Sequence, residues 1–433
     1  MSLLPAQTGN HFQAFSSFDG WSYDRPRLHE WQLKWLNLQL QEILPGNAFY
    51  REKLGTDSLQ LDSLADLSAV PITTKVELVE SAEASPDGLS RHHTYPATDY
   101  SRMHRTSGTT GRPLMLLDSA QDWSWWSGTW QHVLRAAEVT AADRVFLAFS
   151  FGPFVGFWSA HQACVDLGAT VIPGGGLTSL ARLEFLKSSS ASVVCCTPSY
   201  ALHLAEVAAS EGISLTELGI RRIIVAGEAG GSVPAVRQRI EAAWGAKVVD
   251  HSGATEIGPW GFGWPDRIGL HVTETSFIAE LLPIEGSEDD TLKQLVLTSI
   301  GRFGAPVIRY ATGDAVRANL PSDGPCQFLW LPDGVVGRVD NMVTIRGVNV
   351  FPSSIDAIVR QVPEVDEYRV RVFRREHLDE LEIYAEADDL ICGKVQKLLA
   401  VQLGLRINVA HSPAGSLPRS EGKARRWHDE RKS

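Results

Sequence analysis

Hydrophobic positions follow two different patterns along this chain. From about residue 28 they recur at helical spacing as far as Ile43, and Pro45-Gly46 then ends the pattern, which predicts an amphipathic helix. Farther along, short apolar runs alternate with helical patterns, and this alternation predicts a parallel sheet with crossover helices. The apolar runs are residues 145–149, 170–172, 193–196, 223–226 and 247–249.

Four loops follow strands of the predicted sheet. They are residues 151–153, 197–199, 227–230 and 250–256. Ligands in sheets of this kind bind beyond the carboxyl ends of the strands. We therefore expect these loops to converge on one cleft.

The pattern changes near residue 338, where we place a domain boundary. Beyond it, residues 355–360 and 392–402 have helical spacing, whereas 368–373 and 381–385 have the pattern of strands. The predicted fold is α/β: a large domain of mixed and parallel sheets with crossover helices, residues 1–337, and a small α+β domain, residues 338–433.

Glycine and hydroxyl residues are concentrated in the loop at 105–113. Glycine lets successive N–H groups turn toward one anion, and the hydroxyls add donors. No Lys follows, and residues 113–117 predict a strand, so the loop differs from the phosphate loop of kinases and GTPases. A helix begins only after Ser119, which forms a capping box with Asp122. Taken alone, this composition fits an anion site and a solvated turn equally.

Composition and charge exclude some classes of protein. The chain has 433 residues, 40 of them basic and 51 acidic, and the net charge of −11 argues against nucleic-acid binding. No apolar stretch approaches the length of a membrane span, and the five cysteines lack metal-ligand spacing. We expect a cytoplasmic protein that binds neither a membrane nor structural zinc.

Five segments taken together resemble the adenylate-forming superfamily of acyl- and aryl-CoA synthetases. They are residues 106–113, 250–256, 309–314, 337–340 and 417–423, and segments 195–200 and 346–352 are similar to the phenylacetate–CoA ligase branch. The resemblance covers nearly the whole chain. It implies that ATP and a carboxylic acid form an acyl-adenylate, with Mg²⁺ bound, and that coenzyme A then displaces AMP to give a thioester.

The resemblance also assigns residues to the nucleotide. Residues 106–111 would hold the departing phosphates, Thr255 would contact the α-phosphate, and Asp314 with Arg338 would bind the ribose. The family usually has Tyr, stacked on adenine, at the position of Ser252, so the adenine contacts stay open here. The nucleotide-binding set is Thr106, Ser107, Gly108, Thr109, Thr110, Gly111, Gly227, Glu228, Ala229, Asp250, His251, Ser252, Asp314 and Arg338.

Catalysis is assigned to Lys423, Thr255 and Glu256. The resemblance places Mg²⁺ on Glu256 and the ammonium of Lys423 beside the reacting oxygens, where negative charge builds up. Asp340 would be the hinge about which a mobile small domain turns between the two half-reactions. After that turn, three residues would line the coenzyme A channel: Arg346, Gly347 and Asn349.

The acyl pocket is predicted from residues that flank the strand ends. Aromatic side chains among them favour an aromatic monocarboxylic acid. The candidates are Phe151, Phe154, Trp158, Ala226, Gly258, Pro259 and Trp260. Four tryptophans of one predicted helix, Trp123, Trp125, Trp126 and Trp130, are instead expected in the core or a subunit interface.

Two alternatives share these motifs. One is an adenylating enzyme that loads the phosphopantetheine of an acyl carrier protein. The other is a nucleotide-binding homologue without catalysis, which the departure at Ser252 suggests. A homodimer would be usual for the branch.

Overall fold

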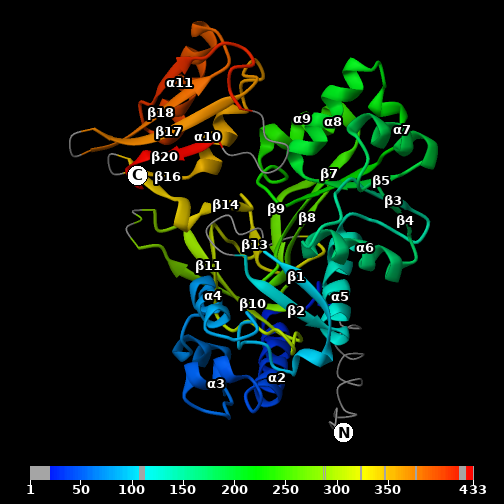
Figure 1. Ribbon diagram of the computed structural model, residues 1–433, viewed down its shortest axis with the longest axis vertical. Helices are drawn as coiled ribbons and strands as arrows, with labels where there is room; N and C mark the ends of the chain where they lie inside the picture. The colour runs from blue at the N-terminus through cyan, green and yellow to red at the C-terminus, as the bar shows by residue number, and fades with distance from the viewer. Residues whose placement is uncertain are drawn as a thin grey trace.

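The computed structural model describes residues 20–106, 113–285, 287, 289–321, 324–345, 348–375, 378–418 and 426–432. Figure 1 shows a large body with a smaller α+β unit, coloured orange and red, at its upper left. The expected α/β architecture with a small C-terminal unit is confirmed.

A sheet of eight strands forms the centre of the large body, in the order β13-β9-β8-β7-β6-β5-β3-β4. Its parallel half is β3 (Arg144–Leu147), β4 (Thr170–Pro173), β5 (Val193–Cys196), β6 (Arg222–Ala226) and β7 (Lys247–Ala254). Its antiparallel half is β8 (Gly258–Trp264), β9 (Arg267–Val272) and β13 (Trp330–Leu331). All five predicted strands are present. Strand β7 extends beyond its predicted end because it also pairs with β8.

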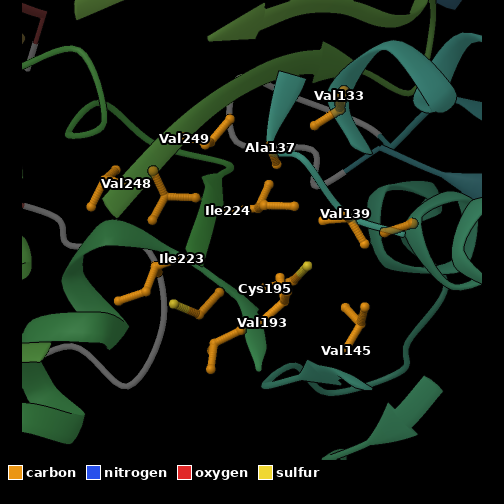
Figure 2. Packing of buried hydrophobic residues seen from close by; sticks show 14 of the residues in the cluster. Val133, Ala137, Val139, Val145, Val193, Cys195, Ile223, Ile224, Val248 and Val249 are labelled. Atoms are coloured by element: carbon orange, nitrogen blue, oxygen red, sulfur yellow. The ribbon is translucent and has the colours of Figure 1, made fainter. Parts of the chain in front are cut away.

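Crossover helices connect the parallel strands. They are α6 (Val155–Leu167), α7 (Ser179–Ser189), α8 (Pro198–Ser210) and α9 (Pro234–Trp244). Helix α5 (Ala120–Ala136) begins at the predicted capping box of Ser119 and Asp122. Figure 2 shows Val133 and Ala137 near Ile224 of β6, within one buried cluster. The four tryptophans of α5 are buried, as expected of core residues.

Antiparallel elements complete the large body. One four-stranded sheet contains β10 (Phe277–Pro283), β11 (Lys293–Ser299), β12 (Tyr310–Val316) and β14 (Val335–Arg338). A separate hairpin pairs β1 (Tyr100–Arg105) with β2 (Met115–Ser119). Helices α2 (Arg25–Ile43), α3 (Ala48–Leu54) and α4 (Lys75–Glu83) precede them, and α2 confirms the first predicted helix (Figure 1). Short 3₁₀ helices are η1 (Leu64–Ala69), η2 (Ala97–Asp99), η3 (Leu215–Glu217), η4 (Val339–Asn341) and η5 (Glu430–Lys432).

The small unit has its own sheet and core. The sheet order is β19-β18-β17-β20, and a buried cluster runs from Val343 to Val409. A second, smaller cluster packs Phe351 against Ala315 of β12. Its elements are β15 (Val343–Ile345), β16 (Val348–Val350), α10 (Pro352–Val359), β17 (Tyr368–Arg375), β18 (Leu378–Ala385), α11 (Asp389–Leu403), β19 (Asn408–His411) and β20 (Trp427–Asp429).

Candidate active site

Two of the four predicted loops, those after β5 and β6, lie in contact with each other. The backbone N–H of Ser199 donates to Glu228 Oε1 at 2.7 Å, which joins the loops after β5 and β6. A Cβ at Gly230 would stand 2.4 Å from Cβ of Pro198, so these loops pack too closely for a larger residue. The N–H of Arg105 donates to the carbonyl of Pro153 at 2.9 Å. That bond ties the β1–β2 hairpin to the loop after β3.

Thr106 closes the base of the glycine-rich loop. Its N–H donates to the carbonyl of Leu114, and its Oγ1 accepts from the N–H of Leu114, both at 3.0 Å. The antiparallel pairing of β1 with β2 confirms that the loop joins two strands. Thr106 and Leu114 therefore continue the pairing of β1 with β2 by two hydrogen bonds.

Glu256 follows β7 and is almost fully buried, with 6% of its side chain exposed. Its Oε1 lies 2.7 Å from Nζ of Lys75, the first residue of α4. Two backbone bonds fix the approach to that helix: Thr73 donates to the carbonyl of Arg309, and Ala311 donates to the carbonyl of Thr73, both at 2.9 Å. The sequence did not reveal Lys75, whose only signal is its place beside a capping box.

The fully buried Arg302 connects Glu256 to the hairpin. Its Nη1 donates to the backbone carbonyl of Glu256 at 3.0 Å, and its Nη2 lies 2.6 Å from Oδ1 of Asp118 in β2. Burial acts to raise the pKa of Asp118, but the nearby Arg302 outweighs it and holds that pKa below its usual value. Burial and the charge of Asp118 raise the pKa of Asp122. Arg302 was also missed, because no motif marks it.

Arg338 lies beside Asp314, as expected, and also contacts Asp340. Nη1 of Arg338 lies 3.2 Å from Oδ1 of Asp314. The same guanidinium donates to both carboxylate oxygens of Asp340, at 3.1 and 3.2 Å. Burial raises the pKa of Asp314 to about 6, and the charge of Arg338 partly offsets this effect. One arginine thus joins the candidate ribose ligand to the candidate hinge.

Asp250, His251 and Ser252 lie within β7 rather than in the loop that the sequence predicted. The carboxylate of Asp250 accepts from the hydroxyl of Ser232, and burial raises its pKa to about 6. The ring of His251 lies 4.4 Å from that of Trp130, and burial lowers its pKa to about 4. Successive strand residues point to opposite faces, so Ser252 points away from this ring. His251 therefore supplies no aromatic surface on the side of Ser252.

The acyl-pocket candidates fall into two groups. Phe151 and Trp158 meet edge to face with 4.9 Å between ring centroids, and Phe154 beside them is partly exposed. On β8, by contrast, Trp260 is buried in the core, and a Cβ at Gly258 would stand 2.6 Å from the Trp125 ring. Pro259 is buried, and Ala226 is half-buried at the end of β6.

Comparisons with known proteins show the family of the chain. A family model described as "AMP-binding enzyme C-terminal domain" matches residues 347–431. Phenylacetate-coenzyme A ligase of Pseudomonas putida is 30% identical over 431 residues, which cover 95% of each chain. The Escherichia coli (strain K12) enzyme of the same name is 29% identical over 420 residues, 92% of this chain and 93% of that one. The chain belongs to the phenylacetate–CoA ligase branch of the adenylate-forming enzymes.

The protein is therefore an AMP-forming acid–thiol ligase that uses ATP, Mg²⁺ and coenzyme A. The hypothesis of a non-catalytic nucleotide-binding homologue gives way to this assignment. A solved 2-hydroxyisobutyryl-CoA ligase in its postadenylation state matches the ligase with a TM-score of 0.87 at 28% identity, over 95% of this chain and 91% of that one. The same enzyme in its thioesterification state matches with a TM-score of 0.70 at 28% identity, over 94% of this chain and 91% of that one. Within the described ranges of the ligase, no helix is long and apolar enough to cross a membrane.

The buried carboxylate of Glu256 suits a magnesium ion that takes its other ligands from substrate phosphates. Mg²⁺ is usually held by one or two carboxylates together with substrate phosphates. Among the residues that the structure describes, no group of three His, Cys, Asp or Glu could hold a metal alone. Glu256 supplies one buried carboxylate, whose charge a cation already balances. A magnesium ion of the ligase would accordingly be shared between Glu256 and the nucleotide.

Several predicted site residues of the ligase lie outside the described residues. They are Ser107, Gly108, Thr109, Thr110, Gly111, Arg346, Gly347 and Lys423. The backbone of Asn349 is described and belongs to β16. Thr255 is half-buried and precedes Glu256 in the chain. Gly227 has φ of 92°, and this residue and Ala229 are exposed in the loop after β6.

Proposed function

We propose that this ligase activates an aromatic monocarboxylic acid and transfers its acyl group to coenzyme A. The observation that carries the aromatic assignment is the edge-to-face pair of Phe151, in the loop after β3, and Trp158, in α6. Aromatic rings prefer this edge-to-face geometry with one another, so a flat ring could extend the pair. The phenylacetate-coenzyme A ligases among the relatives support the same class of acid.

In the first half-reaction, the chain's own residues hold the nucleotide. Residues 106–111 and Thr255 would bind its phosphates, and Asp314 would accept from the ribose hydroxyls while Arg338 holds that carboxylate. Glu256 would hold Mg²⁺, which would supply positive charge to offset that of the phosphates. Nearby positions available to the base are Gly227, Glu228, Ala229 and Ser252, with Asp250 and His251 supporting them from within β7.

Lys423 would stabilise the charge that builds between the substrate carboxylate and the α-phosphate. A unit charge at about 4 Å contributes roughly 4 kcal/mol at an effective dielectric constant of 20, which is about three powers of ten in rate. Lys423 belongs to the small domain, so adenylation would depend on how that domain is placed.

For the second half-reaction, the small domain would turn about Asp340. We assign residues 1–337 to the large domain and 338–433 to the small one, since the separate core begins at Val343. The TM-scores of 0.87 and 0.70 against two states of one related enzyme support this motion, because they differ at equal identity. Arg346, Gly347 and Asn349 would then line the coenzyme A channel. The related coenzyme A ligases favour coenzyme A over a carrier protein as the acceptor. The homodimer and the cytoplasmic location stay predictions.

An exchange assay tests the choice of acid. We expect ATP–pyrophosphate exchange to depend on phenylacetate or a related aryl acid, and to exceed exchange with 2-hydroxyisobutyrate or malonate at least tenfold. Phe151→Ala should raise the KM for the aryl acid and leave the KM for ATP unchanged. Equal exchange with aromatic and small aliphatic acids would refute the aromatic assignment while leaving the ligase activity intact.

A further inference from the structure

The contact between Lys75 and Glu256 has no role in the scheme above. The Lys75 ammonium lies 2.7 Å from Oε1 of Glu256, and it belongs to an element far upstream of the nucleotide motifs. The side chain of Lys75 is 34% exposed, whereas that of Glu256 is 6% exposed. The lysine can therefore swing toward solvent, but the glutamate is held in place.

A buried hydrogen bond also holds the backbone of Glu256. Its backbone carbonyl accepts from Arg302, whose guanidinium is fixed by Asp118. A buried carboxylate is costly unless a cation compensates it. Lys75 supplies that cation, and an ammonium and Mg²⁺ held on one carboxylate repel each other.

We infer that Lys75 is an internal counter-ion that closes the metal position on Glu256 until nucleotide arrives. Free Mg²⁺ must displace the ammonium without help from phosphate oxygens, so it binds the nucleotide-free enzyme poorly. Mg²⁺ that arrives together with ATP brings its own phosphate ligands, and Lys75 then leaves Glu256. Metal and nucleotide consequently enter together. This inference rests on the proposed role of Glu256 as the magnesium ligand.

Thermal unfolding of the nucleotide-free enzyme tests the inference directly. Melting temperature is measured against MgCl₂ at constant ionic strength for the wild type and for Lys75→Gln, Lys75→Arg and Lys75→Gln/Glu256→Gln. Removing a unit charge at this distance should lower the half-saturating Mg²⁺ concentration at least about tenfold in Lys75→Gln. Lys75→Arg keeps the charge and should behave as the wild type. The double variant should lose the response to Mg²⁺.

Lys53→Gln is the matched control, since Lys53 forms its ion pair with Glu77 of the same helix α4 and not with Glu256. It should leave the response to Mg²⁺ unchanged. The inference is overturned if the wild type and Lys75→Gln respond alike, or if the gain in Lys75→Gln persists in the double variant.

A second measurement needs no change at Lys75, in case Lys75→Gln does not fold. Mn²⁺ binding is followed by electron paramagnetic resonance in the wild type and Glu256→Gln, with and without ATP. We expect Glu256→Gln to weaken binding in the presence of ATP only. Weaker binding also without ATP contradicts the closed site. No effect in either condition refutes Glu256 as the metal ligand, and with it this inference, without touching the choice of acid.

Discussion

Arg302 binds two acceptors that belong to different parts of the site, the carboxylate of Asp118 and the backbone carbonyl of Glu256. Breaking a buried ion pair from one side leaves an uncompensated charge. Arg302→Met should therefore lower the free energy of unfolding by about 3–5 kcal/mol, as measured by urea denaturation. Adding Asp118→Asn should recover part of this loss. A loss below about 1 kcal/mol in Arg302→Met would contradict the role of the pair.

The pKa of Asp314 predicts opposite effects of pH on binding and on stability. With a pKa raised to about 6, the carboxyl is protonated below pH 6 and accepts ribose hydroxyls less well. Adenosine does not titrate in this range, so its affinity should fall as pH drops from 7 to 5, by up to tenfold per unit below 6. Because the folded pKa lies above that of an unfolded carboxyl, the contribution of Asp314 to stability falls as pH rises from about 4 to 6.

Calorimetric titration with adenosine measures this effect. Asp314→Asn removes the titrating group, so the variant should bind weakly at every pH. Asp250, whose pKa burial also raises to about 6, is a second carboxyl that titrates in this range and remains in the variant. If adenosine affinity depends on pH in Asp314→Asn as it does in the wild type, another group causes the pH dependence.

At the scale of elements, the proposed hinge lies in η4, between β14 and β15. Proline fixes φ near −65° and has no N–H. Asp340→Pro should keep acyl-adenylate formation and slow transfer to coenzyme A at least about tenfold. Single-turnover kinetics separate the two steps. Asp340→Ala, which loses the same ion pair with Arg338 but keeps a flexible backbone, is the control and should transfer faster.

Elements were predictable where one local pattern determined them. The apolar runs of β3, β4, β5 and β6 and the capping box of α5 gave correct elements. The second half of β7 was missed, because its pairing with β8 depends on tertiary structure. The motifs indicated that Arg338 lies beside Asp314, whereas the contact of Arg338 with Asp340 was not predicted. Lys75 and Arg302 carry no such motif, since each becomes functional only through contact with a residue distant in sequence.

At the scale of the whole molecule, we propose that the two domains act in turn. Lys423→Ala should slow adenylation by about three powers of ten, the rate equivalent of its proposed charge stabilisation. Thioester formation from a supplied acyl-adenylate should fall much less, because that step needs the other domain position. Rapid-quench measurement of each half-reaction checks this. Equal losses in both steps would remove Lys423 from its assigned role.

The central claim is that this ligase converts an aryl acid, ATP and coenzyme A into an aryl thioester and AMP. The most direct test follows all products in one reaction containing phenylacetate and an equal concentration of 2-hydroxyisobutyrate. We predict one AMP and one pyrophosphate for each thioester formed, with the aryl thioester in at least tenfold excess. Predominance of the 2-hydroxyisobutyryl thioester, or AMP released without any thioester, would contradict it.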